Sequence, residues 1–307
     1  MASGYMDYAG YRDCVVLQNS ETRVILGPHM GGRVLEYAYH GVNTLMLDPN
    51  QNGWTYSGEE RPRMGPSGGR FDVGPENTMA PHPNLWFGPW TAEITGEYSA
   101  KMTSQPDSDS GMQLEREFSL SPGSTRLDCR QIVHNIADQT LRCCHWSRTF
   151  GLGHGICVVP LSSYSKFPAK YIMYGPGPVM NYRPDDPHIR VDDEFLVMFD
   201  TPEHPKLGID AHEGWFAYLM PNNLMLVKQF PTFPNRVYNE MAGITISLWY
   251  LKDFVCELEP IGPMEVLTRG EQADFTETWY VVNFPFPEQR DQVDARQVAS
   301  LAQQLMR

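Results

Sequence analysis

One segment of the sequence places two carboxylates close together on the same face of a strand. Between Asp253 and Pro260, alternate residues point to opposite sides, so Glu257 and Glu259 share a face while Cys256 and Leu258 share the other. Neighbouring like charges raise the pKa of one carboxyl group, which suits a general acid or base. A solvated outer strand with ordinary surface carboxylates explains the spacing alone slightly better.

A second segment, Cys143–Phe150, places a histidine among small hydroxyl side chains. By the same alternation Trp146 lies on an apolar face that we expect to be core, while His145 and Ser147 lie on the polar face. The near-neutral pKa of a histidine suits proton transfer, although a plain surface histidine fits equally well. Arg148 falls on the apolar face, where it needs either a bulge or a buried acidic partner.

A third group of candidate residues follows the glycine pair Gly68-Gly69. Glycines let the backbone approach a ligand closely, and an arginine such as Arg70 binds carboxylates or hydroxyls through two donors. Trp86 offers an aromatic face for stacking, and His154 lies in a glycine-rich turn from which it can reach a ligand. An ordinary turn-rich loop with packed tryptophans is the alternative.

The elements that must position these residues are predicted to be antiparallel strands. Short alternating or apolar runs are separated by Gly, Pro, Asn and Asp, and long helical periodicity is almost absent. The predicted strands are Cys14–Gln18, Thr22–Leu26, Arg33–Tyr39, Thr44–Leu47, Trp90–Glu97, Ala100–Ser104, Met112–Leu120, Arg126–Asn135 and Leu141–Phe150.

Two long segments, Gln51–Trp90 and Tyr164–Arg190, show no strand pattern, and we expect them to form the walls of a cleft. Near the C-terminus, apolar residues at helical spacing predict one short amphipathic helix docked on the sandwich. No internal repeat or linker stands out, so residues 1–307 are expected to form a single all-β domain, a large antiparallel β-sandwich.

Composition excludes several classes of function. The net charge of −13 disfavours nucleic-acid binding, and no apolar stretch is long enough to span a membrane. The first residues do not resemble a signal peptide, so a cytoplasmic location is expected. Nine histidines lack the spacing of metal ligands, and we expect neither a metal nor another cofactor. The six cysteines form no C-x-x-C pair and read as reduced, buried thiols.

Together these features resemble the galactose mutarotase-like superfamily, of the aldose 1-epimerase type. The resemblance rests on the turn in Leu26–Arg33, the Gly68–Arg70 loop, the strand carrying His145 and the late strand Val255–Pro260. It implies a β-supersandwich whose concave sheet holds a sugar. The residues after His145 and one additional residue in the late strand depart from the family pattern, which places the chain closer to a bacterial branch than to galactose mutarotase itself.

The resemblance implies a function in which a mono- or oligosaccharide undergoes acid–base chemistry at its anomeric centre, as in an isomerase. Glu259 is the expected base, His145 the expected acid, and Glu257 tunes Glu259. Two alternatives stay open: a non-catalytic carbohydrate-binding or sensing module, and a lyase acting on sugars that contain uronic acids. The expected substrate-binding residues are Arg70, Glu76, Trp86, Arg148 and His154.

Overall fold

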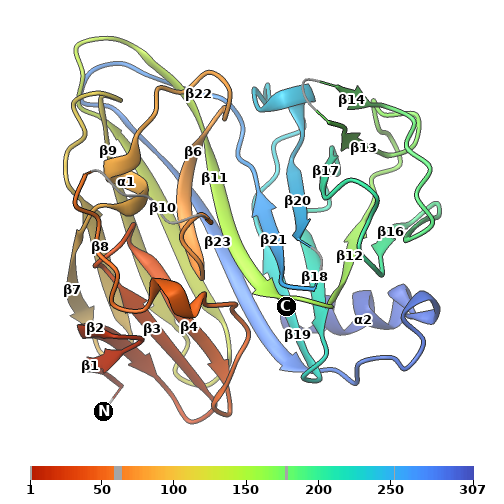
Figure 1. Cartoon of the computed structure of the whole chain (residues 1–307), viewed down its shortest axis with the longest axis horizontal. Coiled ribbons are helices and arrows are strands. Elements are labelled where there is room, and N and C mark those ends of the chain that lie inside the picture. The colour runs from red at the N-terminus through yellow and green to blue at the C-terminus, as the bar shows by residue number, and fades with distance from the viewer. Residues whose placement is uncertain (1, 59–63, 177–178, 252) are drawn as a thin grey trace.

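Two large antiparallel sheets lie face to face in the computed structural model, which describes residues 2–58, 64–176, 179–251 and 253–307 (Figure 1). The predicted all-β sandwich is confirmed. In spatial order, the first sheet contains β1 (Ser3–Tyr8), β2 (Tyr11–Gln18), β3 (Thr22–Gly27), β4 (Arg33–Tyr39), β6 (Gly69–Gly74), β11 (Leu141–Leu152), β21 (Val255–Pro260), β20 (Ile246–Leu251), β17 (Lys206–Ile209), β13 (Tyr171–Tyr174) and β14 (Met180–Asn181), with β5 (Val42–Asn43) beside β4 and β22 (Glu265–Leu267) beside β11.

The second sheet is built mostly from the middle of the chain. Its long central strand β23 lies between a meander of four earlier strands and a second group of five shorter ones. In spatial order it contains β15 (Ile189–Val191), β16 (Phe195–Met198), β12 (Ile156–Pro160), β18 (Trp215–Met220), β19 (Leu224–Gln229), β23 (Gln272–Asn283), β10 (Leu127–Asn135), β9 (Met112–Leu120), β8 (Ser99–Ser104) and β7 (Trp90–Gly96).

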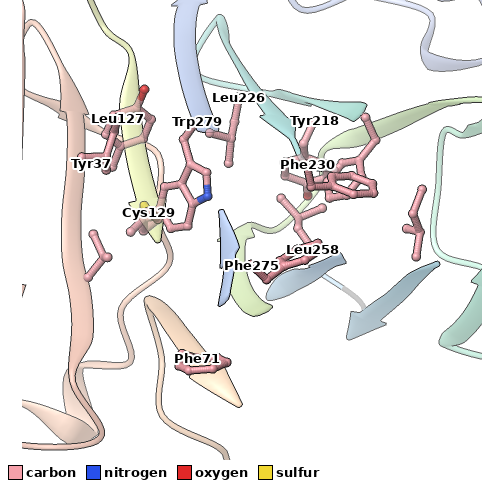
Figure 2. Close-up of a cluster of buried hydrophobic side chains, with 14 of the residues drawn as sticks. Tyr37, Phe71, Leu127, Cys129, Tyr218, Leu226, Phe230, Leu258, Phe275 and Trp279 are labelled. Carbon is pink, nitrogen blue, oxygen red and sulfur yellow. The ribbon is translucent and has the colours of Figure 1, made fainter. Parts of the chain in front are cut away.

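The main core lies between the two sheets. Phe71 on β6, Leu258 on β21, and Phe275 and Trp279 on β23 belong to one buried cluster (Figure 2). These residues alternate along their strands with side chains that point away from the core, as the two-residue period of a strand requires. Burial of the inner faces therefore fixes which side chains of the first sheet reach its outer face.

A second apolar cluster covers the outer face of the other sheet. The C-terminal helix α2 (Ala295–Leu305) begins at Asp294, whose carboxylate accepts hydrogen bonds from the backbone N–H groups of Arg296 and Gln297. Its buried residues Val298 and Ala302 pack with apolar residues of β12, β18 and β19. The predicted C-terminal helix is thus present. No helix in the described part of the chain is long and apolar enough to span a membrane.

The two segments without a strand pattern contain regular structure after all. Gln51–Trp90 includes β6 and the one-turn helix α1 (Pro83–Phe87), and Tyr164–Arg190 includes β13, β14 and the start of β15. β6 begins and ends at glycine within a segment rich in Gly and Pro, and this composition concealed its strand pattern. Conversely, the predicted strand Thr44–Leu47 is reduced to a single bridge at Leu45.

Candidate functional site

Three strands that are neighbours in the first sheet, β6, β11 and β21 (Figure 1), carry a cluster of charged side chains on its outer face. In the antiparallel register Arg148 of β11 lies directly opposite Arg70 of β6, and Trp146 lies opposite Asp72. On the other side, Glu257 of β21 lies opposite Phe150. Like charges directly opposite each other repel, so the two arginines require carboxylates beside them.

Arg148 is the centre of this cluster and meets three carboxylates. Its Nε donates to Oε1 of Glu257 and to Oε1 of Glu259, each at 2.9 Å, and its Nη1 donates to Oδ2 of Asp72 at 3.2 Å. All three carboxylates are buried. The structure thus supplies the buried acidic partners that the sequence required for Arg148, without a bulge at this point of β11.

The carboxylates differ in how readily they ionise. Burial opposes ionisation of Asp72, but the hydrogen bond from His82 and the charges of Arg70 and Arg148 outweigh it and hold the pKa of Asp72 below its usual range. Burial and the negative charge of Glu257 together raise the pKa of Glu259, against the opposing charge of Arg148. The site therefore holds one permanent anion beside a carboxyl group that takes up a proton more easily.

Asp72 also anchors two aromatic residues from the segment around α1. Its Oδ1 accepts hydrogen bonds from Nε1 of Trp86 at 2.5 Å and lies 3.2 Å from Nε2 of His82. The other ring nitrogen of His82 lies 2.7 Å from the carbonyl oxygen of Ala80. Burial disfavours charge on His82, yet the contacts with Asp72 raise its pKa, and two acceptors favour an imidazole protonated at both nitrogens.

Three adjoining cavities lie at this cluster, two of them lined by Arg148, and we refer to them together as the Arg148 cleft. A cavity of about 180 Å³ and one of about 430 Å³ share Glu76, Trp86 and Arg148 in their walls. A third, of about 510 Å³, shares Glu76 and Lys206 with the second. The cavity of about 430 Å³ shares residues with both of the others, so we call it the middle cavity. Its volume is within the size range of small-molecule binding sites.

An ion pair stands at the rim of the cleft where the second and third cavities meet. Nζ of Lys206, at the start of β17, lies 2.8 Å from Oε2 of Glu76. Oε1 of Glu76 lies 3.8 Å from Nη1 of Arg148, so Glu76 links the rim to the floor. The ammonium group of Lys206 also lies about 5.1 Å from the rings of Trp146 and Tyr174, within the range of a cation–π contact.

His145 does not belong to this site, which corrects the expected pairing with Glu259. Its side chain is fully buried between the sheets, where its ring stacks with Phe71 and Phe275. Its Nε2 lies 3.2 Å from the carbonyl oxygen of Ala273 on β23. The face of β11 that carries His145 is therefore the inner face, and the face that carries Trp146 and Arg148 is the outer one.

His154 also lies apart from the cleft. It occupies the turn after β11 with a left-handed backbone conformation, and its exposed ring lies 3.8 Å from the carboxylate of Asp253. It lines none of the three cavities. Of the residues expected at the site, the structure brings six together, Arg148 and five around it: Arg70, Glu76, Trp86, Glu257 and Glu259.

Three acidic or basic residues of the cleft were not among the expected site residues. Asp72 alternates with Arg70 along β6, so the two-residue period would have placed it on the same face had this segment been recognised as a strand. His82 and Lys206 stand alone in the sequence, and no local pattern marks them. Among the described residues, no group of three or more His, Cys, Asp or Glu side chains is arranged to hold a metal ion.

Comparisons with known proteins show that the fold of this chain is a known one. No protein-family model and no curated protein sequence matches the chain. Among solved structures, a candidate aldose 1-epimerase from Escherichia coli K12 superposes with a TM-score of 0.61 at 11% identity, covering 88% of this chain and 98% of its own.

Two further structures agree with it. A protein from Synechocystis superposes with a TM-score of 0.62 at 13% identity, over 91% of this chain and 99% of its own. A galactose mutarotase-like protein from Lactobacillus casei gives 0.55 at 12% identity, over 88% and 100%. The chain therefore has the galactose mutarotase-like fold, as the resemblance in its sequence implied.

Proposed function

We propose that the protein binds a sugar in the Arg148 cleft and interconverts its anomers, as an aldose 1-epimerase does. The observation that carries the proposal is the middle cavity, whose wall contains both the carboxylate of Glu257 and the ammonium group of Lys206. An acid and a base on one cavity are what anomer exchange requires. The fold shared with proteins named for this chemistry adds support.

Glu257 is a better candidate for the base than Glu259, which reverses the roles expected from the sequence. The Glu257 side chain lines the middle cavity, whereas Glu259 is fully buried and lines none of the three cavities. Arg148 holds both carboxylates through the same Nε, which fixes the orientation of Glu257 toward the cavity. Glu259 then acts as the neighbour that shares this donor.

The reaction follows from these positions. Glu257 removes the proton from the anomeric hydroxyl while Lys206 gives a proton to the ring oxygen, so the bond between C1 and the ring oxygen breaks and an aldehyde forms. Rotation about the C1–C2 bond and closure on the opposite face return both protons and give the other anomer. Trp86 and Trp249 in the wall offer aromatic surface for the apolar face of the sugar.

The test is anomer exchange measured by polarimetry on freshly dissolved aldoses. We expect the wild-type protein to accelerate exchange of at least one aldose, and Glu257→Gln to lower kcat by about 100-fold or more while sugar binding persists. Glu117→Gln is the matched control, since Glu117 lies on β9 in the other sheet and is partly exposed beside Arg130.

A full rate in Glu257→Gln would overturn the assignment of the base. A wild-type protein that binds sugars in calorimetry but accelerates the exchange of none would instead be a non-catalytic carbohydrate-binding module. Lys206→Met tests the role of the acid independently of the base, because it leaves the contacts between Arg148 and the buried carboxylates in place.

A further inference from the structure

Arg70 is the cation of the Arg148 cleft whose hydrogen bonds are incomplete. It lies on β6 in the wall of the middle cavity, with its guanidinium carbon 5.2 Å from the ring of Trp86. The residue is only 4% exposed. Its Nε and Nη1 are buried and have no hydrogen-bond partner among the residues that the structure describes. Such donors cost free energy unless something else satisfies them.

The other cations of the cleft are better paired. Arg148 has carboxylate oxygens of three residues within 3.2 Å, and Lys206 has one at 2.8 Å. The carboxylate oxygen paired with Arg70 is Oε1 of Glu257, 3.7 Å from Nη2, and this oxygen already accepts a hydrogen bond from Arg148. Arg70 therefore lacks a close carboxylate of its own.

Backbone closes one side of Arg70, and the cavity that Arg70 lines leaves space for a ligand group. Gly65 passes so close that a Cβ atom there would lie 3.3 Å from Nη2 of Arg70, so the backbone meets the guanidinium without a side chain between them. On the other sides the cavity of about 430 Å³ is bounded by Phe150, Trp249 and Lys206. A sugar ring with one charged substituent fits the size range of such a cavity.

We propose, on the basis of the sugar-binding function above, that the sugar carries an anionic group, a carboxylate or a phosphate, and that Arg70 binds it. A planar guanidinium matches both groups through parallel hydrogen bonds, and these are stronger than bonds to neutral hydroxyls. Lys206 lines the same cavity and adds a second positive charge toward the ligand. The substrate class is thus an acidic or phosphorylated aldose.

The test compares matched sugars by isothermal titration calorimetry: glucose and galactose, glucuronate and galacturonate, and the two hexose 6-phosphates. We expect at least one anionic sugar to bind the wild-type protein about tenfold or more tightly than its neutral counterpart. Arg70→Gln is expected to abolish that preference, because it weakens binding of the anionic sugar at least tenfold more than binding of its neutral counterpart. Arg70→Lys is expected to retain part of the preference, because the charge remains.

Arg130→Gln provides the control, since Arg130 lies on β10 in the other sheet and pairs with Glu117 and Asp274. It is expected to keep the full preference, and circular dichroism melting checks that each variant is folded. A preference for the uronates assigns a carboxylate, and a preference for the 6-phosphates assigns a phosphate.

Three results separate this inference from the function on which it rests. If the wild-type protein binds none of the sugars, the proposed function fails, and the inference fails with it. If neutral and anionic sugars bind equally, or if Arg70→Gln keeps the preference, the inference is overturned while sugar binding stands. If Arg70→Gln weakens neutral and anionic sugars by the same factor, Arg70 only shapes the cleft and the inference is again overturned.

Discussion

At the scale of single residues, His145 and Arg148 lie on opposite faces of the same strand, and burial affects their charges differently. Arg148 keeps its charge because buried carboxylates surround it, and its pKa is raised by Glu257, Glu259 and Asp72 despite burial. His145 has no such partner, and burial lowers its pKa to about 4. One side chain holds a charged cluster together, while the other is a neutral ring within an aromatic stack.

This difference predicts how stability depends on pH. In the unfolded chain His145 takes up a proton below a pKa of about 6.5, but in the folded protein only below about 4, so the unfolded state binds more protons between these values. The free energy of unfolding therefore falls as the pH falls through this window. Between pH 7 and pH 5 the contribution of His145 amounts to roughly 2 kcal/mol.

In His145→Phe this contribution is expected to disappear. Urea denaturation at pH 7 and pH 5 should show a smaller loss of stability in the variant than in the wild-type protein, and the variant should still bind sugar. The neighbouring carboxylates titrate in both proteins and cancel in the comparison. Equal losses in the two proteins, or a variant that is folded but cannot bind sugar, would contradict the placement of His145 in the core.

At the scale of elements, β11 is held in place through its inner face. Lys228 of β19 is fully buried, and its Nζ donates to Oγ of Ser147 at 3.2 Å, to Oγ1 of Thr149 at 2.9 Å and to the carbonyl oxygen of Leu258 at 3.2 Å. These acceptors alternate along β11 and β21 with Arg148, Glu257 and Glu259. The buried ammonium thus ties together the two strands that carry the charged cluster.

These buried contacts of Lys228 explain which part of the site could be predicted from the sequence. For β21 the alternation gave the right facing, because Cys256 and Leu258 are apolar and lie in the core, while Glu257 and Glu259 point to the outer face and are buried within the charged cluster. For β11 it gave the reverse, because Ser147 is a polar residue that points into the core toward Lys228. Alternation shows that two faces differ, but a buried charge on another strand decides which one is inside.

The role of Gly69 was also not predictable from its own segment, because it depends on a distant strand. The Gly68-Gly69 pair was expected to let the backbone approach a ligand, yet a Cβ atom at Gly69 would lie 2.6 Å from the ring of Trp279. Gly69 is therefore needed for packing of β6 against β23, more than 200 residues later in the chain. A contact between segments so far apart leaves no mark in the local pattern.

Removing the buried ammonium is expected to destabilise the protein strongly. In Lys228→Met the carboxylate of Glu277, which lies 2.9 Å from Nζ and is fully buried, loses its cation. Breaking one partner of a buried ion pair costs about 3–5 kcal/mol. Removing both charges in Lys228→Met/Glu277→Gln should recover most of this loss, because Gln131 and Trp279 can still bond to the amide.

Urea denaturation of the single and double variants measures both effects. The explanation fails if the single variant is as stable as the wild-type protein, or if the double variant is no more stable than the single one. Sugar binding by the double variant then reports whether the hydrogen bonds from Lys228 also set the geometry of Arg148 and Glu257.

At the scale of the whole molecule, the outer faces of the two sheets differ: one carries the charged cluster, and the other is partly covered by α2. The charged cluster lies on the outer face of the first sheet, and the main core lies between the sheets. The helix α2 covers part of the outer face of the second sheet. The all-β class and α2 were predictable because they depend on local periodicity. The order of the strands was not, because β6, β11 and β21 become neighbours across nearly 190 residues.

This layering predicts that damage to α2 lowers stability without changing recognition in the cleft. Val298 is fully buried in the cluster between α2 and the second sheet, and a carboxylate there would be desolvated without a cation beside it in that apolar cluster. Val298→Asp is therefore expected to lower the free energy of unfolding by about 3–4 kcal/mol. Ser300→Asp, an exposed position of the same helix, is the matched control and should stay within about 0.5 kcal/mol of the wild-type protein.

Sugar affinity distinguishes a local effect from a global one. At a temperature where Val298→Asp is still folded, its Kd for a sugar should equal that of the wild-type protein, because α2 and the Arg148 cleft lie on opposite outer faces with both sheets between them. Calorimetry at 15 °C, below the lowered Tm, makes the comparison. A weakened Kd in Val298→Asp with an unchanged Kd in Ser300→Asp would show that the second sheet transmits strain through the core to β11 and β21, and that the layers do not act independently.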